Sequence, residues 1–231
     1  VADWFDGRVG GHADLDANTA GTIYRIAPKG FKSRIPKFDL NTTAGQIEAL
    51  KSPAVNVRNS GFTRLKAQGD KAVPAVAKLL KDENPYIAAR GIWLLAQMGP
   101  KGTDKVVSLL RSKNDSTRLV AYRALRRANH NVLAMAAQMA GDHSAAIRRE
   151  VALTMRDVPL EQSRDILIRI AAQFDGHDRT YLEAFGTGCA PKETEIYHTL
   201  ARSAKSAEEW PDSFAWIAWR LHAPEAVNDL K

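Results

Sequence analysis

The chain has 231 residues, a formal net charge of +7, and hydrophobic residues at 45% of its length, which is ordinary for a globular protein. Its single cysteine, Cys189, excludes an intrachain disulfide, a CxxC metal pair and a CxxCH haem attachment within this sequence. No apolar run approaches the ~20 residues of a membrane span. The positive charge fits nucleic acid, an anionic surface or an acidic protein, but acidic residues are interspersed throughout, which favours a solvated basic surface.

Residues 1–40 differ from the rest of the chain because they are rich in glycine and proline and carry no helical pattern. Their strand-like run covers residues 21–26, which are rich in β-branched and aromatic side chains and are followed by Ala27 and Pro28. A lone strand is not stable by itself. We therefore expect an irregular or β segment over residues 1–40 that lies on the remaining chain or belongs to a β domain.

A period of thirty residues runs through the middle of the chain. Each unit has an arginine or alanine, then a small residue or valine three positions later, then a large aliphatic residue or methionine four positions after that. The first position is occupied by Arg58, Ala88, Arg118 and Arg148, and the last by Leu65, Leu95, Leu125 and Met155. Such a fixed period is typical of stacked units that bury their apolar faces against their neighbours. We predict an all-α fold, an α-solenoid of helix pairs over residues 41–231.

Signals for helix starts and stops divide this region into pairs. A short helix is expected over residues 46–51, before the first pair. First helices are expected near 54–67, 85–98, 115–128 and 144–156, and second helices near 71–82, 102–112, 131–140 and 161–173. Two more helices follow near 178–187 and 192–204, and an amphipathic helix begins at Trp210. This last segment is too apolar for a polar cap, so we expect the array to be truncated at its C-terminus.

Asp142 stands six residues before Arg148. Paired helices with a first-helix arginine and a preceding aspartate resemble HEAT repeats, in which these side chains form a hydrogen-bonded ladder between repeats. Before Arg58 and Arg118, the position of the aspartate is occupied by Ser52 and Ser112. The HEAT-like resemblance implies a structural ladder at Asp142, Arg148, Arg58 and Arg118.

Three segments carry a narrower resemblance. The first contains DWFD over residues 3–6, GGH over 10–12 and GTIYRIAPKG over 21–30; the others are DGHDRTYLEA over 175–184 and WRLH over 219–222. Together they resemble the large PVC-type haem-binding proteins, membrane-bound dehydrogenases of the planctomycete–verrucomicrobial group, over essentially the whole chain. A threonine, Thr180, stands where this family is expected to have an aromatic residue.

The resemblance implies a parent protein with a β-propeller like that of quinoprotein glucose/sorbosone dehydrogenases, followed by HEAT repeats and a c-type cytochrome. The N-terminal segment would end the last propeller blade. Haem c, and a quinone cofactor or calcium, would belong to the parent protein, and no cofactor is assigned to this chain. The resemblance also implies export to the periplasm, with other domains of the same polypeptide or a separate protein as partners.

Asp14, Asp16 and Asn18 have the spacing that begins a calcium loop, and His12 precedes them. Thr19 occupies the position of the loop glycine, and no glutamate closes the loop. A polar surface loop is therefore favoured over a metal site at these residues.

His177, Asp178, Arg179 and Glu183 lie in a turn between predicted repeats. Asp178 and Arg179 can cap the following helix, and Glu183 lies one helical turn beyond Arg179, where the two can pair. Local scaffolding of the turn and docking of a neighbouring domain both fit these residues.

The sequence contains no GxSxG, P-loop, GxGxxG or HExxH motif, and its six histidines are scattered. We therefore expect a non-catalytic HEAT-repeat scaffold in a larger exported, cytochrome-linked protein. The alternatives are a basic nucleic-acid-binding solenoid and a peptide-binding adaptor. Nucleic-acid binding would need cations on the second helices, whereas the densest arginines lie within 115–128 and residues 131–140 contain no lysine or arginine. Specific nucleic-acid binding is therefore not expected.

Overall fold

The computed structural model of the chain describes residues 2–3, 22–32, 36–204 and 206–230. The chain divides into two compact units, Val1–Lys37 and Phe38–Lys231. In the first unit, β1 (Ala2–Asp3) pairs antiparallel with β2 (Thr22–Ile23), with Ala2 opposite Ile23.

The strand predicted over residues 21–26 is shorter than expected. Residues 24–28 have no regular secondary structure, and the Ile26 side chain is 84% exposed. In this antiparallel register Ile23 lies opposite Ala2, the first residue of β1, and the described ladder ends with this pair.

The second unit is helical throughout its regular structure, which confirms the predicted all-α class. Its first half contains α1 (Thr43–Lys51), α2 (Val55–Gln68), η1 (Gly69–Lys71), α3 (Val73–Ala77), η2 (Lys78–Lys81), α4 (Pro85–Leu95), α5 (Pro100–Leu109) and α6 (Asp115–Arg127). Its second half contains α7 (Val132–Met139), α8 (Ala145–Thr154), α9 (Leu160–Ala171), α10 (Arg179–Cys189), α11 (Glu193–Ala201), η3 (Ala207–Glu209), α12 (Asp212–Leu221) and α13 (Ala226–Asp229).

One predicted helix is interrupted. Residues 71–82 form α3 between two 3-10 turns, η1 and η2, instead of one continuous helix. Gly69 has φ +56° and ends α2, and Pro74 lies in the first turn of α3. After Ala77 the backbone bonds tighten, with the Lys78 amide donating to the Ala75 carbonyl, which is the 3-10 pattern.

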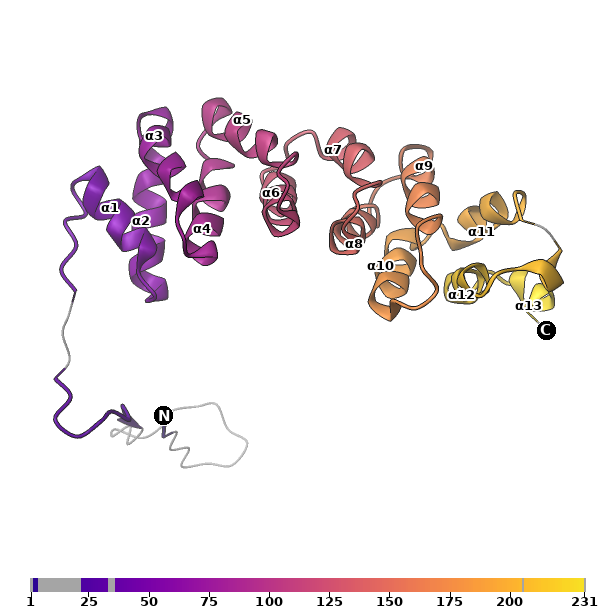
Figure 1. Cartoon of the computed structure of the whole chain (residues 1–231), viewed down its shortest axis with the longest axis horizontal. Helices are drawn as coiled ribbons and strands as arrows, with labels where there is room; N and C mark the ends of the chain where they lie inside the picture. The colour runs from indigo at the N-terminus through magenta and orange to yellow at the C-terminus, as the bar shows by residue number, and fades with distance from the viewer. Residues whose placement is uncertain (1, 4–21, 33–35, 205, 231) are drawn as a thin grey trace, which may run out of the picture. The chain divides into compact units, whose positions relative to one another are not determined.

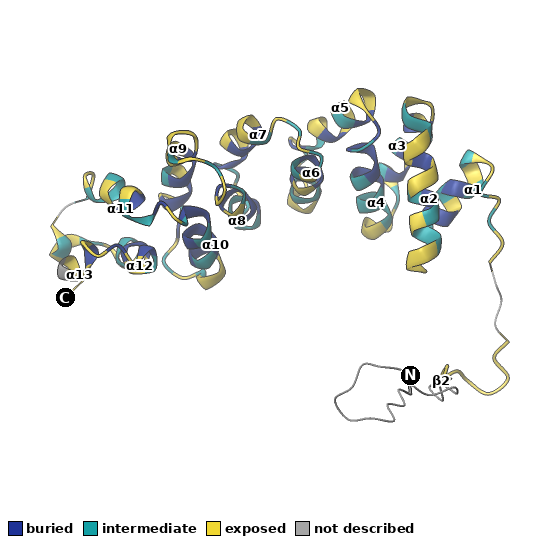
Figure 2. Ribbon diagram, turned by 180° about the vertical axis from the view of Figure 1, so that it is seen from behind, coloured by how far each residue is buried: buried dark blue, intermediate teal, exposed yellow. Residues whose placement is uncertain are grey.

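The helices of this unit form two rows (Figure 1). The even-numbered helices α4, α6, α8 and α10 contact one another in sequence, and α3, α5, α7, α9 and α11 lie in the other row. Each helix has a buried side and an exposed side (Figure 2). The apolar sides therefore meet between successive helices, and the core extends along the whole unit.

The thirty-residue period marks the centre of this core. Leu65, Leu95, Leu125 and Met155 are all 0% exposed. Close helix packing explains the small residues of the period as well: a Cβ atom at Gly61 would lie 2.6 Å from the Gln46 carbonyl oxygen on α1. A larger side chain at this position would push α1 and α2 apart.

We predict that Leu125→Ala lowers the free energy of unfolding by about 2–5 kcal/mol, because it leaves a cavity in a fully buried position. The matched control is Leu153→Ala on α8, because the Leu153 side chain is 41% exposed. This variant should lower the free energy of unfolding by less than about 0.5 kcal/mol. Urea unfolding followed by circular dichroism measures both. Equal costs for the two variants would contradict the register described here.

Candidate functional site

The turns before the first helices share one local geometry. A serine or aspartate side chain accepts a hydrogen bond from the amide two residues later, a common turn-stabilising contact. The bonds run to Ser52 from Ala54 at 3.2 Å, to Asp82 from Asn84 at 3.0 Å, to Ser112 from Asn114 at 3.2 Å, and to Asp142 from Ser144 at 2.8 Å. Since these positions are thirty residues apart, the serine and aspartate of the period have the same local role.

The arginines of the period contact the carbonyl oxygens of these same turns. The contacts are Arg58 with Pro53 at 3.5 Å, Arg118 with Ser112 at 2.8 Å and Lys113 at 3.4 Å, and Arg148 with Asp142 at 2.7 Å and His143 at 3.0 Å. Each arginine thus satisfies carbonyl groups five or six residues earlier, where the preceding helix has ended and its last acceptors lack intrahelical partners.

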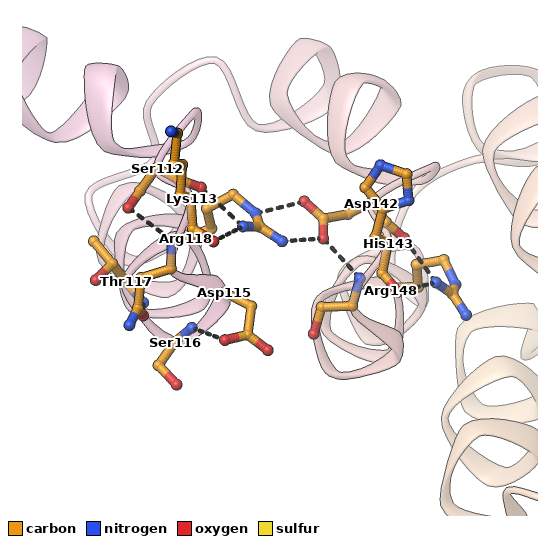
Figure 3. A network of polar contacts seen from close by, with 11 residues as sticks. Ser112, Lys113, Asp115, Ser116, Thr117, Arg118, Asp142, His143 and Arg148 are labelled. Atoms are coloured by element: carbon orange, nitrogen blue, oxygen red, sulfur yellow. Dashed lines mark hydrogen bonds and ion pairs between the residues drawn. The ribbon is translucent and has the colours of Figure 1, made fainter.

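The carboxylate of Asp142 joins two repeats (Figure 3). Arg118 Nε donates to Asp142 Oδ2 at 2.8 Å, and Arg118 Nη2 donates to Asp142 Oδ1 at 2.7 Å. The two side chains are 13% and 10% exposed, so the bidentate pair is largely shielded from water. The Asp142 carboxylate therefore pairs with the arginine of the preceding repeat. Arg148 contacts the backbone carbonyl of Asp142 instead of its side chain.

The pair changes the proton affinity of both groups. Burial by itself would raise the pKa of Asp142, but the hydrogen bonds from Arg118 and from the Ser144 amide outweigh it and hold that pKa below its usual value. The hydrogen bond to Asp142 raises the pKa of Arg118. Both shifts favour the charged pair at neutral pH.

Arg148 contacts a tyrosine on α10. Its Nε donates to the Tyr181 hydroxyl oxygen at 3.1 Å, and its guanidinium lies 5.2 Å from the centre of that ring. The Tyr181 hydroxyl in turn donates to the Ile170 carbonyl at 2.8 Å. Arg148 therefore links the turn before α8 to α9 and α10.

Two further cations bind helix-end carbonyls, and the sequence analysis did not identify them. Arg90 Nη1 donates to the carbonyls of Leu50, Lys51 and Ser52 at 3.0, 2.9 and 3.1 Å, at the end of α1. Lys192 Nζ donates to the carbonyls of Met155, Arg156 and Val158 at 2.9, 3.0 and 3.1 Å, at the end of α8. Both lie outside the arginine position of the period, and their partners are 34–40 residues away in sequence. No local signal could have found them.

The predicted docking turn lies before α10. Asp178 Oδ1 accepts a hydrogen bond from the Tyr181 amide at 3.0 Å and so caps the helix, while its other oxygen lies 3.4 Å from Arg149 Nη1. Arg179 Nη2 lies 2.5 Å from Glu183 Oε1, one turn along the helix. His177 is exposed. Two of the expected local contacts, the cap by Asp178 and the pair of Arg179 with Glu183, are thus present, whereas Arg179 lies in the first turn of α10 and pairs with Glu183.

Glu183 also connects this turn to α12. Arg220 Nε donates to Glu183 Oε2 at 2.6 Å, and Arg179 lies 5.0 Å from the centre of the Trp219 ring. The hydrogen bond from Arg220 lowers the pKa of Glu183. A Cβ atom at Gly186 would lie 2.3 Å from the Arg220 guanidinium carbon, so the glycine lets this arginine cross α10. The segments 175–184 and 219–222 therefore contact each other.

An aromatic surface lies beside this junction. Trp216 and Trp219 are 44% and 40% exposed, and their rings meet edge to face at 5.6 Å. The His222 ring lies 5.6 Å from Trp219. Next to them is an open cavity of 310 Å³, lined by Phe174, Gly176, His177, Arg179, Leu182 and Trp216. We call this region, Trp216, Trp219 and the cavity, the aromatic surface.

The arginines of α6 are largely engaged within the protein. Arg123 donates to the Glu150 carboxylate, and Arg126 Nη1 lies 3.2 Å from Glu150 Oε2 and 3.1 Å from Thr154 Oγ1. Glu150 is only 8% exposed. This helix therefore presents fewer unpaired cations than its sequence indicates.

Asp14, Asp16 and Asn18 lie outside the described residues, as does His12. Among the residues that the structure describes, no group of three or more histidine, cysteine, aspartate or glutamate side chains could hold a metal ion. Over the same part of the chain, no helix is both long and apolar enough to cross a membrane. No protein-family model matches the chain, and no curated protein matches it.

We predict that Arg118→Ala lowers the free energy of unfolding by roughly 1.5–3 kcal/mol, because the shielded Asp142 carboxylate loses its charged partner and the turn carbonyls lose the guanidinium donor. The control is Lys101→Ala. Its side chain is 73% exposed and pairs with Asp70 at 3.3 Å, so its removal should cost less than about 1 kcal/mol. Urea unfolding at pH 7 compares the two variants. An unchanged free energy of unfolding for Arg118→Ala would show that its pair with Asp142 does not stabilise the fold.

A second prediction concerns pH. Because the folded pKa of Asp142 lies below its unfolded value, its contribution is present above about pH 4 and is lost as the pH falls through the folded pKa. The difference in unfolding free energy between the wild type and Asp142→Asn should therefore be greatest near neutral pH and shrink below about pH 4. A difference for Asp142→Asn that did not vary with pH would be inconsistent with this assignment.

Proposed function

We propose that the chain is a non-catalytic HEAT-like α-solenoid, a scaffold that holds other domains of a larger protein or a protein partner. The two rows of helices and the turn contacts repeated every thirty residues support this assignment. In such a stack the cations at the turns hold neighbouring units together, which is a structural role. The ladder arginines and Asp142 belong to this framework.

The aromatic surface is the single observation that carries the interaction role. Large exposed aromatic side chains in a cluster mark interaction sites, and tryptophan and arginine are enriched among the residues that contribute most to protein interfaces. Trp216 and Trp219 lie beside Arg179, and the ion pairs of Glu183 with Arg179 and Arg220 fix the backbone below them. A partner would thus meet a prearranged surface, which reduces the entropy lost on binding.

The proposed parent protein is an exported, dehydrogenase-type protein with a cytochrome, as the resemblance implies. The contacts of Glu183 with Arg220 and of Arg179 with Trp219 join the two resembling segments 175–184 and 219–222, which supports a common role for them. Haem c, and a quinone cofactor or calcium, would be bound by other parts of that protein. The role of this chain would be to hold the propeller and the cytochrome in position or to bind a partner.

We predict that antibodies raised against this chain detect a protein far larger than 25.4 kDa in the exported fraction of source cells, and that this protein stains for haem. A native protein of about the size of this chain, without haem, would refute the proposed parent protein.

Hydroxyl-radical footprinting of the parent protein and of the isolated chain tests whether a neighbouring domain docks on the aromatic surface. Trp216 and Trp219 should be oxidised less in the parent protein than in the isolated chain, because a neighbouring domain covers them. Tyr86, which is 75% exposed on α4, serves as the control and should be oxidised equally in both. Equal oxidation of the tryptophans in both samples would show that no domain docks there.

A further inference from the structure

A groove runs between α5 and the segment formed by α3 and η2, in the row of helices that does not carry the ladder arginines. It consists of two open cavities of 510 and 590 Å³ that share Pro74, Lys105 and Ser108 as lining residues. No site is predicted here from the sequence. The groove is also separate from the aromatic surface, which is formed by α10, α12 and the turn before α10.

The two cavities differ in charge. The 510 Å³ cavity is lined by two carboxylates and two ammonium groups, and Lys101 Nζ lies 3.3 Å from Asp70 Oδ2. The 590 Å³ cavity is lined by Lys78, Lys81 and Lys105, with no acidic residue among its lining residues. All three lysines are exposed, and within the described part of the chain none of them forms an ion pair. The positive charge of the groove is therefore concentrated at one end.

The same cavity has an apolar lining. Pro74, Ala77, Leu80 and Leu109 line it together with the three lysines, and Ala77, Leu80 and Leu109 are half-buried. Its volume is within the range of ordinary ligand-binding clefts. A ligand that fits must supply negative charge near the lysines and an apolar group for the aliphatic side chains.

We propose that this cavity binds an acidic segment of a protein in which a large apolar side chain lies among carboxylates. The apolar side chain would contact Leu80 and Leu109, and the carboxylates would pair with Lys78, Lys81 and Lys105. Charge complementarity of this kind speeds association and fixes the register of the bound segment. The inference rests on this groove and does not depend on the proposed parent protein.

The lining favours a protein segment over a nucleic acid. Single-stranded nucleic acids bind to aromatic platforms along a continuous basic track, and no aromatic side chain lines either cavity. Asp70 and Asp104 interrupt the basic track at one end, and α7, the next helix of this row after α5, has no lysine or arginine. Few phosphates could be contacted at once, whereas tight binding of a polynucleotide needs many such contacts.

Fluorescence anisotropy with labelled probes tests the proposal on the chain as it stands. The probe is a short peptide with one leucine flanked by glutamates; its matched forms carry glutamine for glutamate or serine for leucine. Single-stranded oligothymidylate of equal charge is the nucleic-acid probe. The acidic leucine peptide should bind most tightly, and both of its matched forms should bind more weakly.

The double variant Lys78→Glu/Lys105→Glu should weaken binding of the acidic leucine peptide by about tenfold at low salt, since attraction is replaced by repulsion at two of the three lysines that line the cavity. The control Arg64→Glu/Arg127→Glu makes the same change in net charge at exposed positions on α2 and α6 and should change binding by less than about twofold. Circular dichroism checks that both variants are folded. Equal loss in both variants, no preference for leucine over serine, or tighter binding of oligothymidylate than of the peptide would each overturn the proposal.

Discussion

The fold of the helical unit depends on cationic side chains that bind carbonyl oxygens at the ends of helices. The helices of this unit contact mainly their neighbours, so the interfaces between neighbouring helices contribute much of its stability. Arg90, Arg118, Arg148 and Lys192 each reach turn or helix-end carbonyls that would otherwise lack partners. Short helices leave carbonyl groups without intrahelical partners at their ends. These side chains bind such carbonyls and so make them part of the interfaces between helices.

Because cations are used in this way, the net charge of the chain overstates the positive charge that is free to bind a partner. Several of the positive groups contact carbonyl oxygens within the helical unit or pair with Glu150, Glu183 and Asp142, so much of the positive charge is balanced within the protein. Lys78, Lys81 and Lys105 are different because they are exposed and no carboxylate lines the 590 Å³ cavity that they share. The positive charge of the proposed binding cavity is therefore local, whereas the sequence shows only a general excess of positive charge.

The two proposed binding regions use different physical chemistry. The aromatic surface offers large rings over a backbone fixed by ion pairs, which suits a stable contact with another domain. The basic cavity offers long, mobile ammonium groups over aliphatic side chains, which suits a weaker, salt-dependent contact with an acidic segment. They lie on helices far apart in the sequence, so one scaffold could bind two partners without competition between them.

The sequence by itself determined the class of fold, the positions of most helices and the central core residues, because these follow from local periodicity and from turn residues such as Asn84, Asn114 and Asp178. It also located the serine and aspartate positions of the turns. Only the tertiary structure decided that Asp142 pairs with Arg118 and not with Arg148, that Arg90 and Lys192 reach across repeats, and that Lys105 shares a cavity with Lys78. The reason is physical: a long side chain selects its partner by the distance and angle between packed helices, and these depend on the fit of side chains distant in the sequence.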